Sequence, residues 1–182
     1  MARKQPDAIA MLKADHRLVE ELFDKFENAT RRDQKERLAK QICTELTVHT
    51  MIEEEIFYPA CQGAVEDDML DEAIVEHDGA KVLMAQIENG KPDDEFYDAK
   101  VKVLSEMIKH HVHEEEMRSE GLFAQAREAG LDMDELAAQM MDRKQELMGE
   151  IKAKGLPAPT TKSFGVSNKK PGGLMKYLYG GL

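Results

Sequence analysis

The stretch HTMIEEEIFYP, residues 49–59, carries the strongest indication of both fold and function. His49 and Glu53 are four residues apart, so on an α-helix both side chains project from one face. The same face carries apolar residues at helical spacing, namely Leu38, Ile42, Leu46 and Ile56. Histidine and glutamate therefore occupy positions where a helix normally presents leucine to a core.

Three other segments show an apolar stripe of the same period. The stripes comprise Ile9, Leu12, His16, Val19, Phe23 and Phe26; then Leu70, Ile74, His77, Met84 and Ile87; then Val101, Leu104, Ile108, His111 and Glu115. A fifth helix is expected from the cap formed by Asp132 and Glu135 to about Ile151. Short connections between amphipathic helices predict an all-α fold: an antiparallel up-down four-helix bundle with an additional C-terminal helix.

The composition changes near residue 153. Residues 153–182 contain five lysines and no acidic residue, together with half of the glycines and prolines of the chain. We expect residues 1–152 to form the helical domain and residues 153–182 to form a flexible, basic, largely disordered tail. A protein partner is the expected ligand of such a tail.

The overall composition narrows the classes of partner. A net charge of −11 disfavours nucleic acid as a ligand, because phosphate repels an acidic surface. No run approaches the roughly 18 apolar residues that a membrane span needs, and the N-terminal residues lack the apolar core of a secretory signal. Cys43 and Cys61 are expected to be buried free thiols, so the predicted location is the cytoplasm.

The histidine pattern recurs in the two halves of the chain. His16 precedes His49 by 33 residues, and His77 precedes His111 by 34. Each half therefore has one histidine on its first helix and a His-x-x-x-Glu pair on its second. Burying four histidines and two carboxylates is costly unless something compensates them, and a pair of metal ions would do so. The predicted ligands are His16, His49, Glu53, His77, His111 and Glu115.

The donor types indicate the class of metal. Imidazole and carboxylate without thiolate suit iron, manganese or zinc, and two shared carboxylates suit a bimetallic centre. Iron is preferred on redox grounds.

The last ligand pair has an alternative one residue earlier. His110 with Glu114 reproduces the 33-residue spacing, whereas His111 with Glu115 continues the apolar stripe. The stripe favours the second pair, and His110 and His113 are then expected at the surface. The neighbouring acids Glu54, Glu55, Glu114 and Glu116 are interpreted most simply as a solvated face, with the alternative that one of them bonds a ligand histidine.

These motifs resemble the bacterial hemerythrin-like family with the HHE cation-binding domain. The resemblance rests on Asp-His-Arg at 15–17, on residues 49–59, on Glu76-His77 and on HHVHEEE at 110–116, and it covers roughly residues 7–151. It implies a bundle that holds two iron ions bridged by an oxo or hydroxo group. The invertebrate oxygen carriers have one more ligand histidine, where this chain has Ala73. The resemblance therefore implies a more open site.

Two functions are compatible with an open di-iron site. The leading hypothesis is a protein that binds or senses dioxygen or a related small molecule. The alternative is an enzyme that breaks down peroxide or reduces nitric oxide at the metals.

Overall fold

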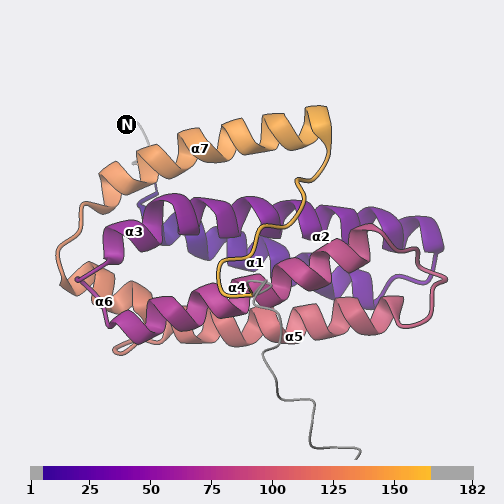
Figure 1. Ribbon diagram of the computed structural model, residues 1–182, viewed down its shortest axis with the longest axis horizontal. Helices are drawn as coiled ribbons and strands as arrows, with labels where there is room; N and C mark the ends of the chain where they lie inside the picture. Colours follow the sequence, from indigo (N-terminus) through magenta and orange to yellow (C-terminus); the bar gives the residue numbers. More distant parts are fainter. Residues whose placement is uncertain (1–5, 165–182) are drawn as a thin grey trace, which may run out of the picture.

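The computed structural model describes residues 6–164, and these residues form helices and loops without a strand. The helices are α1 (Ala8–Glu27), α2 (Arg32–Ile52), the π-helical turn η1 (Glu53–Phe57), α3 (Tyr58–Cys61), α4 (Asp67–Glu88), α5 (Tyr97–Glu116), α6 (Leu122–Glu128) and α7 (Met133–Lys154). The predicted all-α class is confirmed. The turns between successive long helices lie at alternate ends of the molecule (Figure 1).

The four long helices α1, α2, α4 and α5 pack side by side, and α7 lies against α1 and α2 (Figure 1). The predicted cap of α7 is present, because the Asp132 side chain accepts a hydrogen bond from the Glu135 N–H at 3.0 Å. No helix among the described residues is long and apolar enough to cross a membrane.

The interior consists of two apolar clusters separated by a layer of polar side chains. One cluster includes Leu12, Ile52 and Phe57, and the other includes Val19, Leu46 and Leu104. Each such side chain contributes about 1.5–3 kcal/mol when it is fully buried. The layer between them consists of the predicted ligands, which are all buried: His16, His49, Glu53, His77, His111 and Glu115.

The second long helix continues through Tyr58-Pro59 and ends at Cys61. Pro59 has no N–H and its ring crowds the carbonyl of Glu55, so a regular α-helical ladder is disfavoured here. The chain instead widens into the π-helical turn of η1, in which the Tyr58 N–H bonds the Glu53 carbonyl, and then resumes as α3. Such turns are common at functional sites, and this one begins at Glu53.

The segment after α7 contacts the bundle through Leu156 and through Lys162 and Ser163. The Asp78 carboxylate, fully buried on α4, accepts hydrogen bonds from the backbone N–H groups of Lys162 and Ser163 at 2.8 and 2.6 Å. Burial opposes ionisation, but these bonds and the Ser163 hydroxyl lower the pKa of Asp78 to about 2. Residues 153–164 therefore differ from the flexible tail that their composition predicts. The remainder of that tail lies outside the described residues.

Gly121 allows α6 to pack on the end of α5. A Cβ atom at this position would lie 2.6–2.7 Å from the carbonyl oxygens of Glu114, Glu115 and Met117. These oxygens belong to backbone, so they cannot rotate away as a side chain would. Gly149, within α7, has no such neighbour within 4 Å.

We predict that Gly121→Ala lowers the free energy of unfolding by about 1–3 kcal/mol, because the last turn of α5 must move. Gly149→Ala is the matched control and should raise it by about 0.5–1 kcal/mol through helix propensity. Urea denaturation followed by circular dichroism measures both. Equal effects of the two substitutions would contradict the packing described for Gly121.

Candidate metal centre

The six predicted ligands come together at mid-height of the bundle. His16 is on α1, His49 on α2, Glu53 on η1, His77 on α4, and His111 and Glu115 on α5. Their donor atoms form two groups, each with all members within 4.8 Å: His16, His49, Glu53 and Glu115 in the first, and Glu53, His77 and His111 in the second. The helical hairpins predicted from the repeat thus contribute one histidine pair each.

The geometry within each pair fits a metal ion. The Nε2 atoms of His16 and His49 are 3.1 Å apart, as are those of His77 and His111. Ligand atoms that surround one ion at about 2.1 Å at right angles lie about 3 Å apart. Each pair therefore has the separation of two neighbouring ligands.

The two glutamates lie between the histidine pairs. Glu53 Oε2 is 3.2 Å from His49 Nε2 and 3.4 Å from His77 Nε2. Glu115 Oε2 is 3.3 Å from His16 Nε2 and 3.6 Å from His111 Nε2. Each carboxylate oxygen thus faces one histidine from each half of the chain, which is the arrangement of a shared ligand.

A second ring of carboxylates faces the outer nitrogens of the histidines. The Nδ1 atoms of His16 and His77 lie 2.8 Å from Glu116 and 3.1 Å from Glu54. His111 Nδ1 lies 2.8 Å from Glu76. A proton held on Nδ1 by such a bond leaves the Nε2 lone pair free for a cation.

The fourth histidine has a longer contact of the same kind. His49 Nδ1 lies 3.8 Å from Asp15 Oδ2, which is beyond hydrogen-bond distance. Lys144 of α7 bonds the other oxygen of Asp15. The C-terminal helix thus contributes to the surroundings of the site as well as to packing.

The simplest interpretation of the neighbouring acids is therefore wrong for Glu54 and Glu116, which bond histidines instead of forming a solvated face. Glu55 pairs with Arg143 of α7, and Glu114 pairs with His110. The sequence patterns also indicated no role for Tyr58. Its hydroxyl is buried, donates a hydrogen bond to Glu115 Oε1 at 2.9 Å and lies 3.4 Å from His77 Nε2. A tyrosine five residues after the shared glutamate, in a segment that also contains a proline, was the available signal.

The alternative ligand pair lies outside the bundle core. His110 is 62% exposed and contacts Glu114 at 3.2 Å on the outer face of α5. His111 and Glu115 occupy the interior. His113 is exposed, as the stripe predicts.

Burial and neighbouring charges shift the pKa values of the buried histidines and glutamates away from their usual values. Burial and the neighbouring Glu115 raise the pKa of Glu53 well above its usual value. Burial lowers the pKa values of His49 and His77 to about 4. Burial also opposes the ionised form of Glu115, but the nearby His111 and His16 lower its pKa to about 2.

Several polar atoms in the site are buried without a hydrogen bond. They include both carboxylate oxygens of Glu53 and Glu115 Oε2. Such atoms normally cost free energy comparable to a lost hydrogen bond. A bound cation would satisfy them, so the residues present fit a metal.

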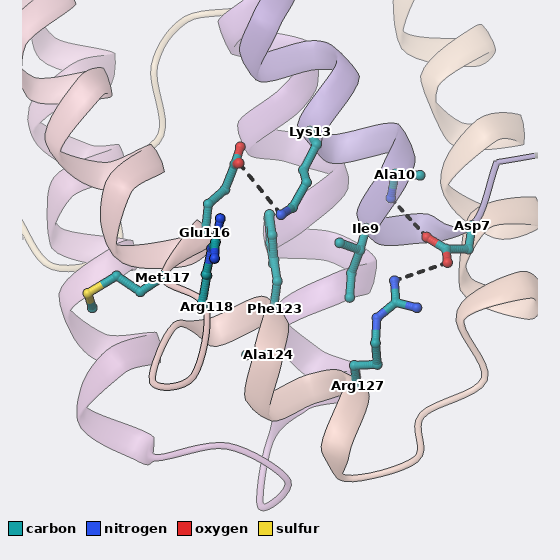
Figure 2. A pocket seen from close by; sticks show the side chains of 10 residues that line it. All are labelled: Asp7, Ile9, Ala10, Lys13, Glu116, Met117, Arg118, Phe123, Ala124 and Arg127. Atoms are coloured by element: carbon teal, nitrogen blue, oxygen red, sulfur yellow. Dashed lines mark hydrogen bonds and ion pairs between the residues drawn. The ribbon is translucent and has the colours of Figure 1, made fainter.

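Two cavities adjoin this region. One has a volume of about 390 Å³. Figure 2 shows that its lining includes the basic side chains Lys13, Arg118 and Arg127 and the acids Asp7 and Glu116. Phe123 lines this cavity and stacks on the His16 ring at 5.8 Å, so it separates the cavity from the donors. The second cavity, of about 260 Å³, reaches His111 and Glu115 directly and includes Ala73 in its wall.

Comparisons with known proteins bear on the family and on the fold. The family described as Hemerythrin HHE cation binding domain matches residues 7–123. The crystal structure of a hemerythrin HHE cation binding domain-containing protein from Mycobacterium kansasii superposes with a TM-score of 0.65 at 20% identity, covering 85% of this chain and 97% of that one. At this identity the likeness shows the fold alone.

A curated relative matches over a shorter region. A protein named DNA nickase from Nostoc sp. (strain PCC 7120) is 27% identical over 106 residues, which is 58% of this chain and 30% of that protein. The chain therefore spans less than a third of the length of this relative.

Glu53 and Glu54 should respond to substitution with opposite signs in the metal-free protein. The raised pKa of Glu53 means that the folded chain keeps a proton that the unfolded chain releases above pH 4.5, so stability falls as pH rises. Burial opposes ionisation of Glu54, but hydrogen bonds with His77 and Lys81 lower its pKa to about 2. The contribution of Glu54 to folding stability is therefore present above pH 4.5 and lost as pH falls toward 2.

We therefore predict that Glu53→Gln is more stable than the parent chain near neutral pH, and that Glu54→Gln is less stable. The effect of Glu53→Gln should shrink as pH falls toward 4.5, and the effect of Glu54→Gln should shrink as pH falls from about 4.5 toward 2. Urea denaturation of chelator-treated protein across this range measures them. Destabilisation by Glu53→Gln at pH 7 would contradict the assignment of an uncompensated buried carboxylate.

Proposed function

The chain belongs to the Hemerythrin HHE cation binding domain family, and on this premise we propose that its buried donors hold two iron ions. His16 and His49 would bind one ion and His77 and His111 the other, with Glu53 and Glu115 shared between them. The observation that carries the proposal is the pair of shared carboxylates. Their inward oxygens accept no hydrogen bond although they are buried.

The donor set favours iron within the class of cations. Imidazole nitrogen and carboxylate oxygen suit iron, manganese or zinc. The two thiols belong to the apolar clusters and are absent from both donor groups. Bound iron would supply redox chemistry toward dioxygen, peroxide or nitric oxide.

An open position is expected on the side of His77 and His111. Glu115 Oε2 lies 3.6 Å from His111 Nε2 but 3.3 Å from His16 Nε2, so this shared glutamate is nearer the His16 side. The cavity of about 260 Å³ reaches this side, and its wall includes several glutamates, so we call it the acidic cavity. Ala73 in the same wall leaves room that a larger residue would fill. Carboxylates in its wall favour a neutral small molecule over an anion. We propose that dioxygen or a molecule of similar size binds there.

A contact between the centre and the C-terminal segment favours a sensing role. Glu54 bonds His77 through Oε1, and its Oε2 is 3.1 Å from Lys162 Nζ. Asp78, the neighbour of His77, fixes the backbone of the same segment. A change at His77 would therefore alter contacts that position residues 162 and 163.

The buried hydroxyl of Tyr58 favours the enzymatic alternative. Burial and the nearby carboxylates raise the pKa of Tyr58, so the hydroxyl keeps its proton beside Glu115 and His77. The Tyr58 hydroxyl would therefore hold a proton beside the metal-binding donors, where peroxide breakdown or nitric oxide reduction would need one.

For the metal assignment, we predict that Glu115→Ala loses bound iron while its neighbour Glu114→Ala retains it. Glu115 lies between two histidines, whereas Glu114 pairs with the exposed His110. Iron per chain after anaerobic reconstitution is the measurement. Iron loss in Glu114→Ala with retention in Glu115→Ala would show that the alternative register forms the centre.

For the function, we predict that dioxygen added to the reduced iron protein in a stopped-flow instrument gives an absorption change that reverses under vacuum. Tyr58→Phe should retain iron and shift the affinity, since it removes a hydrogen bond to Glu115. Irreversible oxidation by dioxygen, together with sustained gas release from peroxide that Tyr58→Phe abolishes, would establish the enzyme instead.

A further inference from the structure

A third group of metal-binding side chains lies on the surface between α4 and α5. Its members are Glu76, His110 and Glu114, whose donor atoms all lie within 4.8 Å of one another. His110 Nε2 is 3.2 Å from Glu114 Oε1 and 3.6 Å from Glu76 Oε1. One imidazole and two carboxylates form a donor set that suits a divalent cation.

This surface group adjoins the buried centre through a shared residue. Glu76 Oε1 faces His110, while its Oε2 accepts the Nδ1 proton of His111 at 2.8 Å. Glu76 and Glu114 also line the cavity of about 260 Å³ whose inner wall contains His111 and Glu115. Glu115 is 2% exposed, and its Oε2 accepts no hydrogen bond. The cavity thus connects exposed donors with a buried carboxylate, one oxygen of which accepts no hydrogen bond.

The charge of the cavity wall favours passage of a cation. Glutamates predominate among the residues that line it: Glu66, Glu72, Glu76, Glu114, Glu115 and Glu120. No lysine or arginine belongs to the described lining. The cavity in Figure 2 is less acidic, because three basic residues line it beside Asp7 and Glu116. Phe123 also separates that cavity from His16. A cation would therefore be attracted to the α4–α5 side of the molecule.

We propose that Glu76, His110 and Glu114 form a capture site that takes up Fe²⁺ or a similar divalent cation from solvent and delivers it through the acidic cavity to His111 and Glu115. The proposal rests on the proposed metal centre. Partial exposure and three protein donors make this a site from which a cation can dissociate inward, whereas the buried groups retain it.

The test measures uptake of Co²⁺ by metal-free protein, because Co²⁺ gives visible absorption when it enters a histidine and carboxylate site. The variant combines His110→Ala with Glu114→Gln and leaves Glu76 intact, since Glu76 also bonds His111. The matched control combines His113→Ala with Glu106→Gln. It removes the same residue types from exposed positions of α5 that do not line the cavity.

We expect the capture-site variant to take up Co²⁺ about tenfold more slowly at low ionic strength, with the same final Co²⁺ per chain as the parent. The control should match the parent rate. Equal uptake rates in all three proteins would overturn the capture site but not the buried centre. Equal slowing in both variants would also overturn the capture site, because it would indicate a general attraction of Co²⁺ to the acidic surface. Failure of the parent to take up Co²⁺ would overturn the buried centre and the capture site together.

A second readout addresses the surface group directly. After the buried centre is filled with Zn²⁺, titration with Mn²⁺ followed by electron paramagnetic resonance should reveal one further weak site per chain in the parent and the control. The His110→Ala/Glu114→Gln variant should lack it. Identical Mn²⁺ binding by all three proteins would overturn the assignment of these donors.

Discussion

The structure depends on two carboxylates, Glu53 and Glu115, that are buried at the centre of the bundle between two histidine pairs. Their inward oxygens accept no hydrogen bond, although buried oxygens normally do so. In the absence of a cation the conflict appears as a raised pKa for Glu53 and a lowered pKa for Glu115. Two cations would satisfy these oxygens and all four Nε2 atoms at once. The polar layer between the apolar clusters is then a means of binding metal and not a defect in the core.

Much of the remaining structure orients these donors. Glu54 and Glu116 follow the two shared glutamates and bond His77 and His16. Asp15 and Glu76 precede the first histidine of each half and face the histidine of the partner helix. The repeat detected in the ligands therefore extends to the residues that hold them. Lys144 on α7 contacts Asp15, and Lys162, beyond α7, contacts Glu54. Elements outside the bundle are therefore coupled to the centre.

Local patterns were sufficient for the five long helices and for the burial of the six predicted ligands, because helical spacing determines which residues share a buried face. The same rule separated His111 from His110. Contacts between distant segments were not predictable in this way. The bonds from Glu116 to His16 and from Glu76 to His111 depend on which helices become neighbours. In the sequence, a glutamate next to a ligand residue is equally typical of a solvated helix face. The docking of residues 162 and 163 on Asp78 depends on backbone hydrogen bonds, which composition does not reveal.

The most direct test of a shared site for two metals is X-ray absorption at the iron edge on anaerobically reconstituted protein of known iron content. We expect close to two iron ions per chain, directly bound nitrogen and oxygen atoms only, and a scattering contribution from the neighbouring iron. One iron ion per chain without an iron neighbour, or sulfur bound directly to iron, would contradict the assignment of the buried histidines and glutamates as a shared site for two metals.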